Sequence, residues 1–112
     1  MITMKISTIY KSSDYTHLSQ CQTIWWVCFL LQSGDTYQAK IQADLKQYPT
    51  LKLSACVLNN ALKFMLAEKL ILSYQQPIKG RGQPRKMYQV NPDSQAIVKD
   101  FANLWRQINE TV

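Results

Sequence analysis

The sequence has few of the residues that build metal sites, disulfide frameworks and hydrolytic active sites. It has three cysteines, Cys21, Cys28 and Cys56, none of them in a CxxC spacing, and His17 is its single histidine. An odd number of separated cysteines indicates neither a disulfide framework nor a zinc site, and it favours a reducing, cytoplasmic setting. HExxH, GxSxG and paired-carboxylate patterns are also missing, so we expect no enzyme activity, no metal and no cofactor.

Long apolar runs and low-complexity tracts are missing as well. The longest apolar run, Ile24–Leu31, is eight residues long, far short of the ~20 that cross a bilayer. The first eleven residues lack the continuous apolar segment of a secretory signal. With a hydrophobic fraction of 46%, three glycines and four prolines, we expect residues 1–112 to fold as a single domain.

Acidic residues are scarce in the middle of the chain. Residues 36–91 contain nine lysines and arginines against two acids, a net charge of +7, and the remainder contains four basic and five acidic residues, a net charge of −1. These sum to the +6 of the whole chain. A basic middle between nearly neutral ends predicts a surface that faces a polyanion. A solvated lysine-rich surface is the alternative.

Hydrophobic periodicity and capping residues predict four helices and one β-hairpin. The helices are expected at about residues 13–32, 36–47, 54–69 and 92–110, and the hairpin at 71–90, with strands at 71–78 and 85–90. The expected N-caps are Ser13 or Asp14, then Asp35, and Asn91 for the last helix. This is an α+β, mostly α layout. Its order of elements is that of a winged helix-turn-helix with a two-stranded wing.

A basic loop, KGRGQPRK at residues 79–86, joins the two expected strands. A phosphate-binding P-loop is excluded because GxxxxGK[ST] is absent. A minor-groove hook would need a second arginine where Gln83 stands. The tip of a DNA-binding wing fits better, since glycine turns the chain while lysine and arginine pair with phosphates. A wing residue of this kind, Arg81, is expected to enter the minor groove.

The first and last expected helices carry more apolar surface than one small core covers, so we infer a second copy of the chain. The residues expected at that dimer interface are Trp25, Trp26, Phe29, Phe101, Leu104 and Trp105. The alternative is that the first helix is the central core helix of a single chain.

The expected DNA contacts fall into three groups. Asparagine pairs bidentately with adenine and lysine reaches guanine or phosphate, so the third helix should face base edges through Ser54, Cys56, Asn59, Asn60 and Lys63. The lysines near the helix-turn-helix that should contact phosphates are Lys40, Lys46 and Lys52, and the wing should add Lys79, Arg81, Arg85 and Lys86. An adaptor that docks an acidic protein partner is the competing hypothesis, and RNA binding is a further one, although Tyr74 and Tyr88 look like strand-packing residues.

The segment LSACVLNNALKFMLAEKLI, at residues 53–71, resembles the recognition helix of PadR-like winged-helix transcriptional regulators, in which a Leu-Ser pair opens the helix. The wing segment KGRGQPRKMYQV, at residues 79–90, is similar to the Gly- and Arg-rich wing of that family. Lys69 stands where the family usually has glycine, so we expect a less sharply turned helix exit. The resemblance implies a homodimer, clasped by its first and last helices, that binds promoter DNA and represses transcription.

Overall fold

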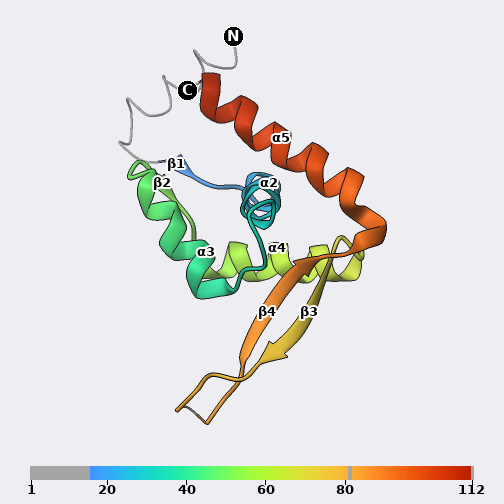
Figure 1. Ribbon diagram of the computed structural model, residues 1–112. Helices are drawn as coiled ribbons and strands as arrows, with labels where there is room; N and C mark the ends of the chain where they lie inside the picture. Colours follow the sequence, from blue (N-terminus) through green and yellow to red (C-terminus); the bar gives the residue numbers. More distant parts are fainter. Residues whose placement is uncertain (1–15, 81, 112) are drawn as a thin grey trace.

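The computed structural model describes residues 16–80 and 82–111. The expected caps Ser13 and Asp14 and the wing residue Arg81 lie outside this part of the chain. The described helices are α2 (Gln20–Leu31), α3 (Gln38–Asp44), α4 (Ala55–Ala67) and α5 (Gln95–Thr111), with 3₁₀ turns at Leu45–Gln47 and Pro92–Ser94. The strands are β1 (Thr16–His17), β2 (Leu51–Lys52), β3 (Ile71–Gln76) and β4 (Arg85–Val90). The mostly α winged-helix fold expected from the sequence is confirmed (Figure 1).

The first helix begins at Gln20, not near residue 13 as expected. Ser19 is its N-cap, and the two residues of a capping box bond each other: the Gln22 backbone N–H donates to Ser19 Oγ at 3.2 Å, and the Ser19 N–H donates to Gln22 Oε1 at 2.9 Å. Two first-turn donors are thereby satisfied, which stops the helix from extending backwards. The preceding β1 instead pairs in parallel with β2.

The second helix also begins later than expected, at Gln38, with Tyr37 at the N-cap position and no side-chain cap. The residue before Tyr37, Thr36, exchanges two backbone hydrogen bonds with Tyr88, at 3.1 and 2.8 Å. This bridge holds the chain extended along β4, so the helix cannot start there. The expected cap Asp35 is used differently, because its carboxylate accepts a 2.6 Å hydrogen bond from the Tyr74 hydroxyl.

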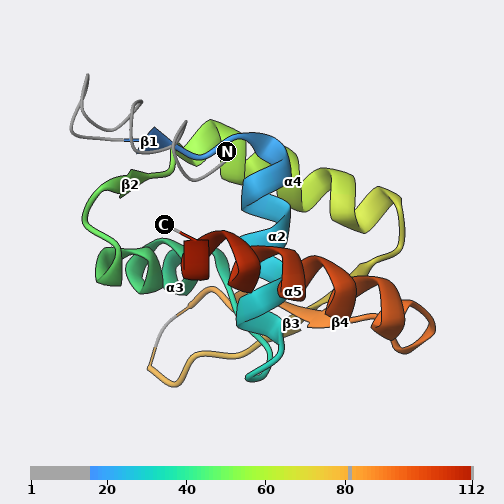
Figure 2. The same ribbon diagram turned by 90° about the horizontal axis from the view of Figure 1, so that it is seen from above.

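Helix α2 lies in the middle of the helices, between α5 and α4, and packs most extensively against these two (Figures 1 and 2). Its Trp26 is fully buried, and the ring centroid lies 5.0 Å from that of Trp105 on α5 and 5.7 Å from that of Tyr48. The Trp26 indole N–H donates to the Ile41 carbonyl of α3 at 3.4 Å. The central core helix of a single chain is therefore what covers most of the apolar surface of α2.

The recognition-like helix α4 ends in a sharp turn, and the expectation of a less sharply turned exit at Lys69 is wrong. Lys69 adopts φ +60°, a left-handed conformation that usually requires glycine. The Lys69 N–H donates to the Leu66 carbonyl at 3.1 Å and the Leu70 N–H to the Met65 carbonyl at 2.9 Å, which is a Schellman motif. The Lys69 carbonyl also accepts two side-chain hydrogen bonds, from Asn91 Nδ2 at 2.9 Å and Ser94 Oγ at 2.8 Å.

The wing is an antiparallel hairpin whose pairing runs from Ile71 opposite Val90 to Gln76 opposite Arg85. Its helix-proximal end joins the core through the buried Ile71 and Tyr88. Its other end extends away from the helices (Figure 1). Asn91 accepts the Asp93 N–H at 3.1 Å, as expected of a cap, and Pro92 begins the 3₁₀ turn that leads into α5. In the described part of the chain, none of the helices is both long and apolar enough to cross a membrane.

Candidate nucleic-acid interface

Helix α4 has a buried face and an exposed polar face. Leu58, Ala61, Leu62 and Met65 are buried in the core. The residues that the sequence assigned to base edges, by contrast, are all exposed: Ser54, Cys56, Asn59, Asn60 and Lys63. The helix starts cleanly, because Ser54 Oγ accepts the Val57 N–H at 3.0 Å. The structure thus gathers the five residues at one exposed surface, and their contact with DNA remains a prediction.

One of these side chains is already engaged within the chain. Asn60 Nδ2 lies 3.8 Å from Cys56 Sγ, one turn earlier on α4. A thiol sulfur is a weak acceptor, so the amide of Asn60 can exchange this contact for a base edge at little cost. The carbonyl oxygen of the same amide is not used in that contact, which leaves the bidentate adenine-binding geometry available to it.

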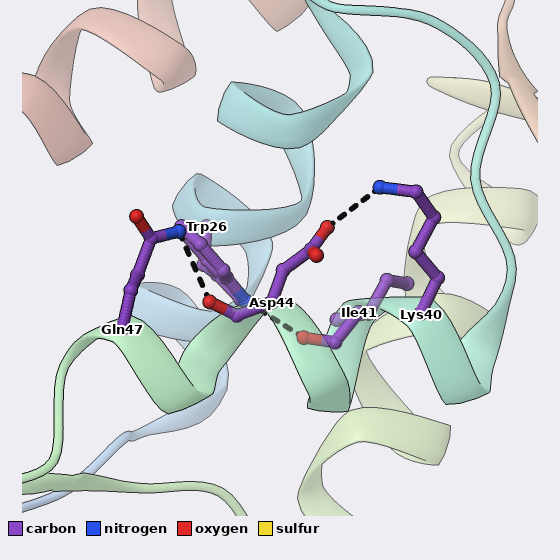
Figure 3. A network of polar contacts seen from close by, with 5 residues as sticks. All are labelled: Trp26, Lys40, Ile41, Asp44 and Gln47. Carbon is purple, nitrogen blue, oxygen red and sulfur yellow. Dashed lines mark hydrogen bonds and ion pairs between the residues drawn. The ribbon is translucent and has the colours of Figure 1, made fainter.

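The lysines of the helix-turn-helix differ in how free they are. Lys40 Nζ makes a 2.8 Å ion pair with Asp44 Oδ2, and Gln47 Nε2 donates to the Asp44 backbone carbonyl at 3.0 Å (Figure 3). Exposed pairs of this type contribute little, so Lys40 can leave Asp44 for a phosphate, but its charge is partly neutralised meanwhile. Lys46 and Lys52 are exposed and line an open hollow of about 330 Å³ beside the turn that leads from α3 to α4.

The wing places its basic residues beside α3. Lys79 and Lys86 are exposed, whereas Arg85 is half-buried. The Arg85 guanidinium lies over the ring of Tyr37, with Cζ 4.0 Å from the ring centroid, and Lys86 Nζ lies 5.7 Å from the ring centroid of Tyr88. Gly80 has φ +80°, which matches the expectation that glycine turns the chain at the wing tip.

Tyr37 is the residue of this surface that the sequence analysis missed. Its spacing from Ile41 and Leu45 placed it on the inner stripe of the second helix. The structure instead places Tyr37 before α3 in extended backbone, half-buried and against Arg85. The signal that could have found it is the aromatic residue directly before the helix, but its contact with a strand some fifty residues later is set by tertiary structure.

The expected dimer residues separate into two groups. Trp26 and Trp105 are 0% and 1% exposed, so the expectation for these two is corrected: their rings fill the core and present no surface to a second copy. Trp25, Phe29 and Phe101 are half-buried and Leu104 is 36% exposed. Ile97, which the sequence analysis did not select, is 50% exposed. With spacings of four and three residues, Ile97, Phe101 and Leu104 lie on one face of α5.

The described residues contain no group of three or more histidines, cysteines or acids close enough to hold a metal ion. Cys21 and Cys56 are exposed, while Cys28 is buried in the core. Burial raises the pKa of the Cys28 thiol to about 12, because a thiolate there would lose its hydration. Cys28 therefore behaves as a small apolar core residue.

Comparisons with known proteins identify relatives among solved structures. No family model matches the sequence, and no curated protein matches it. The circadian clock associated protein Pex from Anabaena is 32% identical, with a TM-score of 0.82 over 96% of this chain and 94% of that chain. Pex from Synechococcus sp. (strain PCC 7942) is 30% identical, with a TM-score of 0.80 over 96% of this chain and 97% of that chain.

A more distant likeness is that to PadR from Bacillus subtilis, whose structure is that of a complex with operator DNA. It is 19% identical, with a TM-score of 0.57 over 70% of this chain and 45% of that chain. At that identity the likeness shows a shared fold alone. The two Pex proteins reach at least 30% identity and match nearly the full length of both chains, so this chain belongs to the Pex family, with a PadR-like winged-helix fold.

Proposed function

We propose that this chain is a sequence-specific DNA-binding transcriptional regulator, a homodimeric repressor of promoters that acts in the cytoplasm. The observation that carries the proposal is the exposed face of α4, with Asn59, Asn60 and Lys63, in a winged helix whose residues 36–91 have a net charge of +7 (nine basic residues minus two acids). Amides read adenine in the major groove and basic residues hold the backbone, which are the two components of specific DNA binding.

Two relatives support this proposal. The PadR protein of Bacillus subtilis, which shares the fold, was solved in complex with operator DNA. The relative from Anabaena is described as circadian clock associated, so we propose that clock genes are among the targets. A dimer would present two α4 helices to half-sites about one helical turn apart, roughly 34–36 Å.

The division between base and phosphate contacts can be tested by selecting bound fragments from a random duplex library. Fluorescence anisotropy then compares the selected duplex with a scrambled one at several salt concentrations. N59A and N60A should lose discrimination between the duplexes, because amides read bases. K46A should weaken both equally and reduce the slope of log K against log salt by about 0.9, the value for one phosphate contact. K99A, which removes an exposed lysine from α5, is the matched control and should leave the slope unchanged.

Binding to the selected duplex no tighter than to the scrambled one would overturn the proposal. Such an outcome, together with tight binding to an acidic protein, would favour the adaptor hypothesis instead.

The homodimer can be tested separately on α5. L104E introduces a charge among exposed apolar residues, and we expect it to shift sedimentation from dimer to monomer, since burying an unpaired carboxylate is costly. Leu72 on β3 is similarly exposed, 39% against 36% for Leu104, and lies on the wing, so L72E is the matched control. A dimer that persists in L104E and dissociates in L72E would contradict the assignment of this face.

A further inference from the structure

The start of α3 and the beginning of β4 are joined by one aromatic–cation contact. The Arg85 guanidinium carbon lies 4.0 Å from the centroid of the Tyr37 ring. An arginine so placed is attracted by the ring quadrupole, and its planar group lies against the ring. Contact through the plane leaves the N–H edges of the guanidinium directed to the side. The contact thus restrains Arg85 without using its hydrogen-bond donors.

The position of Tyr37 is set independently of Arg85. Its neighbour Thr36 is held by two backbone hydrogen bonds to Tyr88, at 3.1 and 2.8 Å. Residues alternate between the two faces of an extended segment, so Asp35 and Tyr37 lie on the side opposite to Thr36. On that side the Tyr74 hydroxyl donates to Asp35 at 2.6 Å. The segment that carries Tyr37 is therefore fastened to both strands of the wing.

The donors of Arg85 face a space that can take an anion. Among the described residues Arg85 makes no ion pair, the pair of Lys40 and Asp44 being elsewhere on α3. Arg85 and Lys86 line an open hollow of about 460 Å³ between α3 and the wing, together with Tyr37, Gln38, Gln83 and Pro84. Two cations and an amide with no acid among the lining residues form a favourable environment for a phosphate.

We propose that this hollow binds a phosphate of the DNA backbone and that Tyr37 is the positioning residue that holds Arg85 for it. The proposal rests on the proposed DNA-binding function and deepens it. Arg85 contacts the phosphate, whereas Tyr37 acts through Arg85. The stack reduces the freedom that a long arginine side chain would otherwise lose on binding. It also ties the orientation of the wing base to that of α3.

The test is a double-mutant cycle between the two residues. Fluorescence anisotropy measures affinity for a random-sequence DNA duplex, because a phosphate contact does not depend on sequence. We expect R85A to weaken binding and to reduce the salt slope by about 0.9. Y37L should weaken binding by about two- to five-fold per wing, the range that an exposed cation–π contact converts to. Y37F keeps the ring and should bind like the unchanged protein, and Y37L added to R85A should cost nothing further.

The outcomes separate this inference from the proposed function. If R85A weakens binding while Y37L does not, or if the effects of Y37L and R85A simply add, Tyr37 does not position Arg85 although DNA binding stands. If the unchanged protein fails to distinguish a selected duplex from a scrambled one, the proposed function itself fails. Circular dichroism and thermal melting check that Y37L is folded. R85K, which leaves Tyr37 intact, provides a second route: it keeps the charge but not the planar stack, so it should retain the salt slope and lose affinity.

Discussion

Replacement of Lys69 by glycine should stabilise the protein. Lys69 has φ +60°, and a left-handed conformation costs a residue with a Cβ atom about 1–2 kcal/mol. Glycine avoids that cost but loses more backbone freedom on folding, about 0.5–1 kcal/mol. The hydrogen bonds from Asn91 and Ser94 end on the Lys69 backbone carbonyl, so they survive the substitution. We therefore expect K69G to raise the free energy of unfolding by about 0.5–1 kcal/mol, and the melting temperature by about 2–6 °C.

Urea and thermal unfolding, followed by circular dichroism, measure this change. K69A is the matched control, because it also removes the exposed charged side chain but retains Cβ, and it should not be stabilised. If K69G were no more stable than K69A, the left-handed backbone at this position would carry no strain and the reasoning would be refuted.

Three further predictions concern capping, thiol reactivity and pH. S54A should lower the free energy of unfolding by about 1 kcal/mol in urea titrations, whereas S54N, which also caps, should be nearly neutral. A thiol reagent should modify the exposed Cys21 and Cys56 in the native protein and the buried Cys28 only after unfolding; a third fast thiol would contradict this. The hydrogen bond that Tyr74 donates to a carboxylate raises its pKa, so the folded state keeps this proton longer than the unfolded chain. Its stabilisation is present below pH ~10 and lost as pH rises through the folded pKa; Y74F should flatten this alkaline decline, and an unchanged profile would contradict the assignment.

Local sequence signals predicted most of the elements. The inner face of α4 was readable because Leu58, Ala61, Leu62 and Met65 recur at helical spacing, and all four are buried. The start of α2 was also readable, since Ser19 and Gln22 have the spacing of a capping box. It was missed because an earlier Ser-Asp pair offered a competing cap. The exposure of Asn59 and Asn60, and hence the candidate site, followed from the same helical spacing.

The start of α3 could not be read in this way. Asp35 is a good N-cap by residue type, yet it accepts a hydrogen bond from Tyr74, thirty-nine positions later in the chain. Thr36 likewise pairs with Tyr88 of β4. Such contacts depend on how the wing folds back onto the helices, and no local pattern encodes them.

The sequence by itself determined the order of the elements, the basic middle of the chain and the polar face of its third helix, because these depend on residue type and spacing along a single element. Only the tertiary structure decided what covers each apolar face. Trp26 and Trp105 pack against each other inside one chain, whereas Ile97 and Leu104 remain exposed on the outside of α5. Helical spacing shows which residues share a face, but burial depends on the elements that pack against that face, and these come from distant parts of the chain.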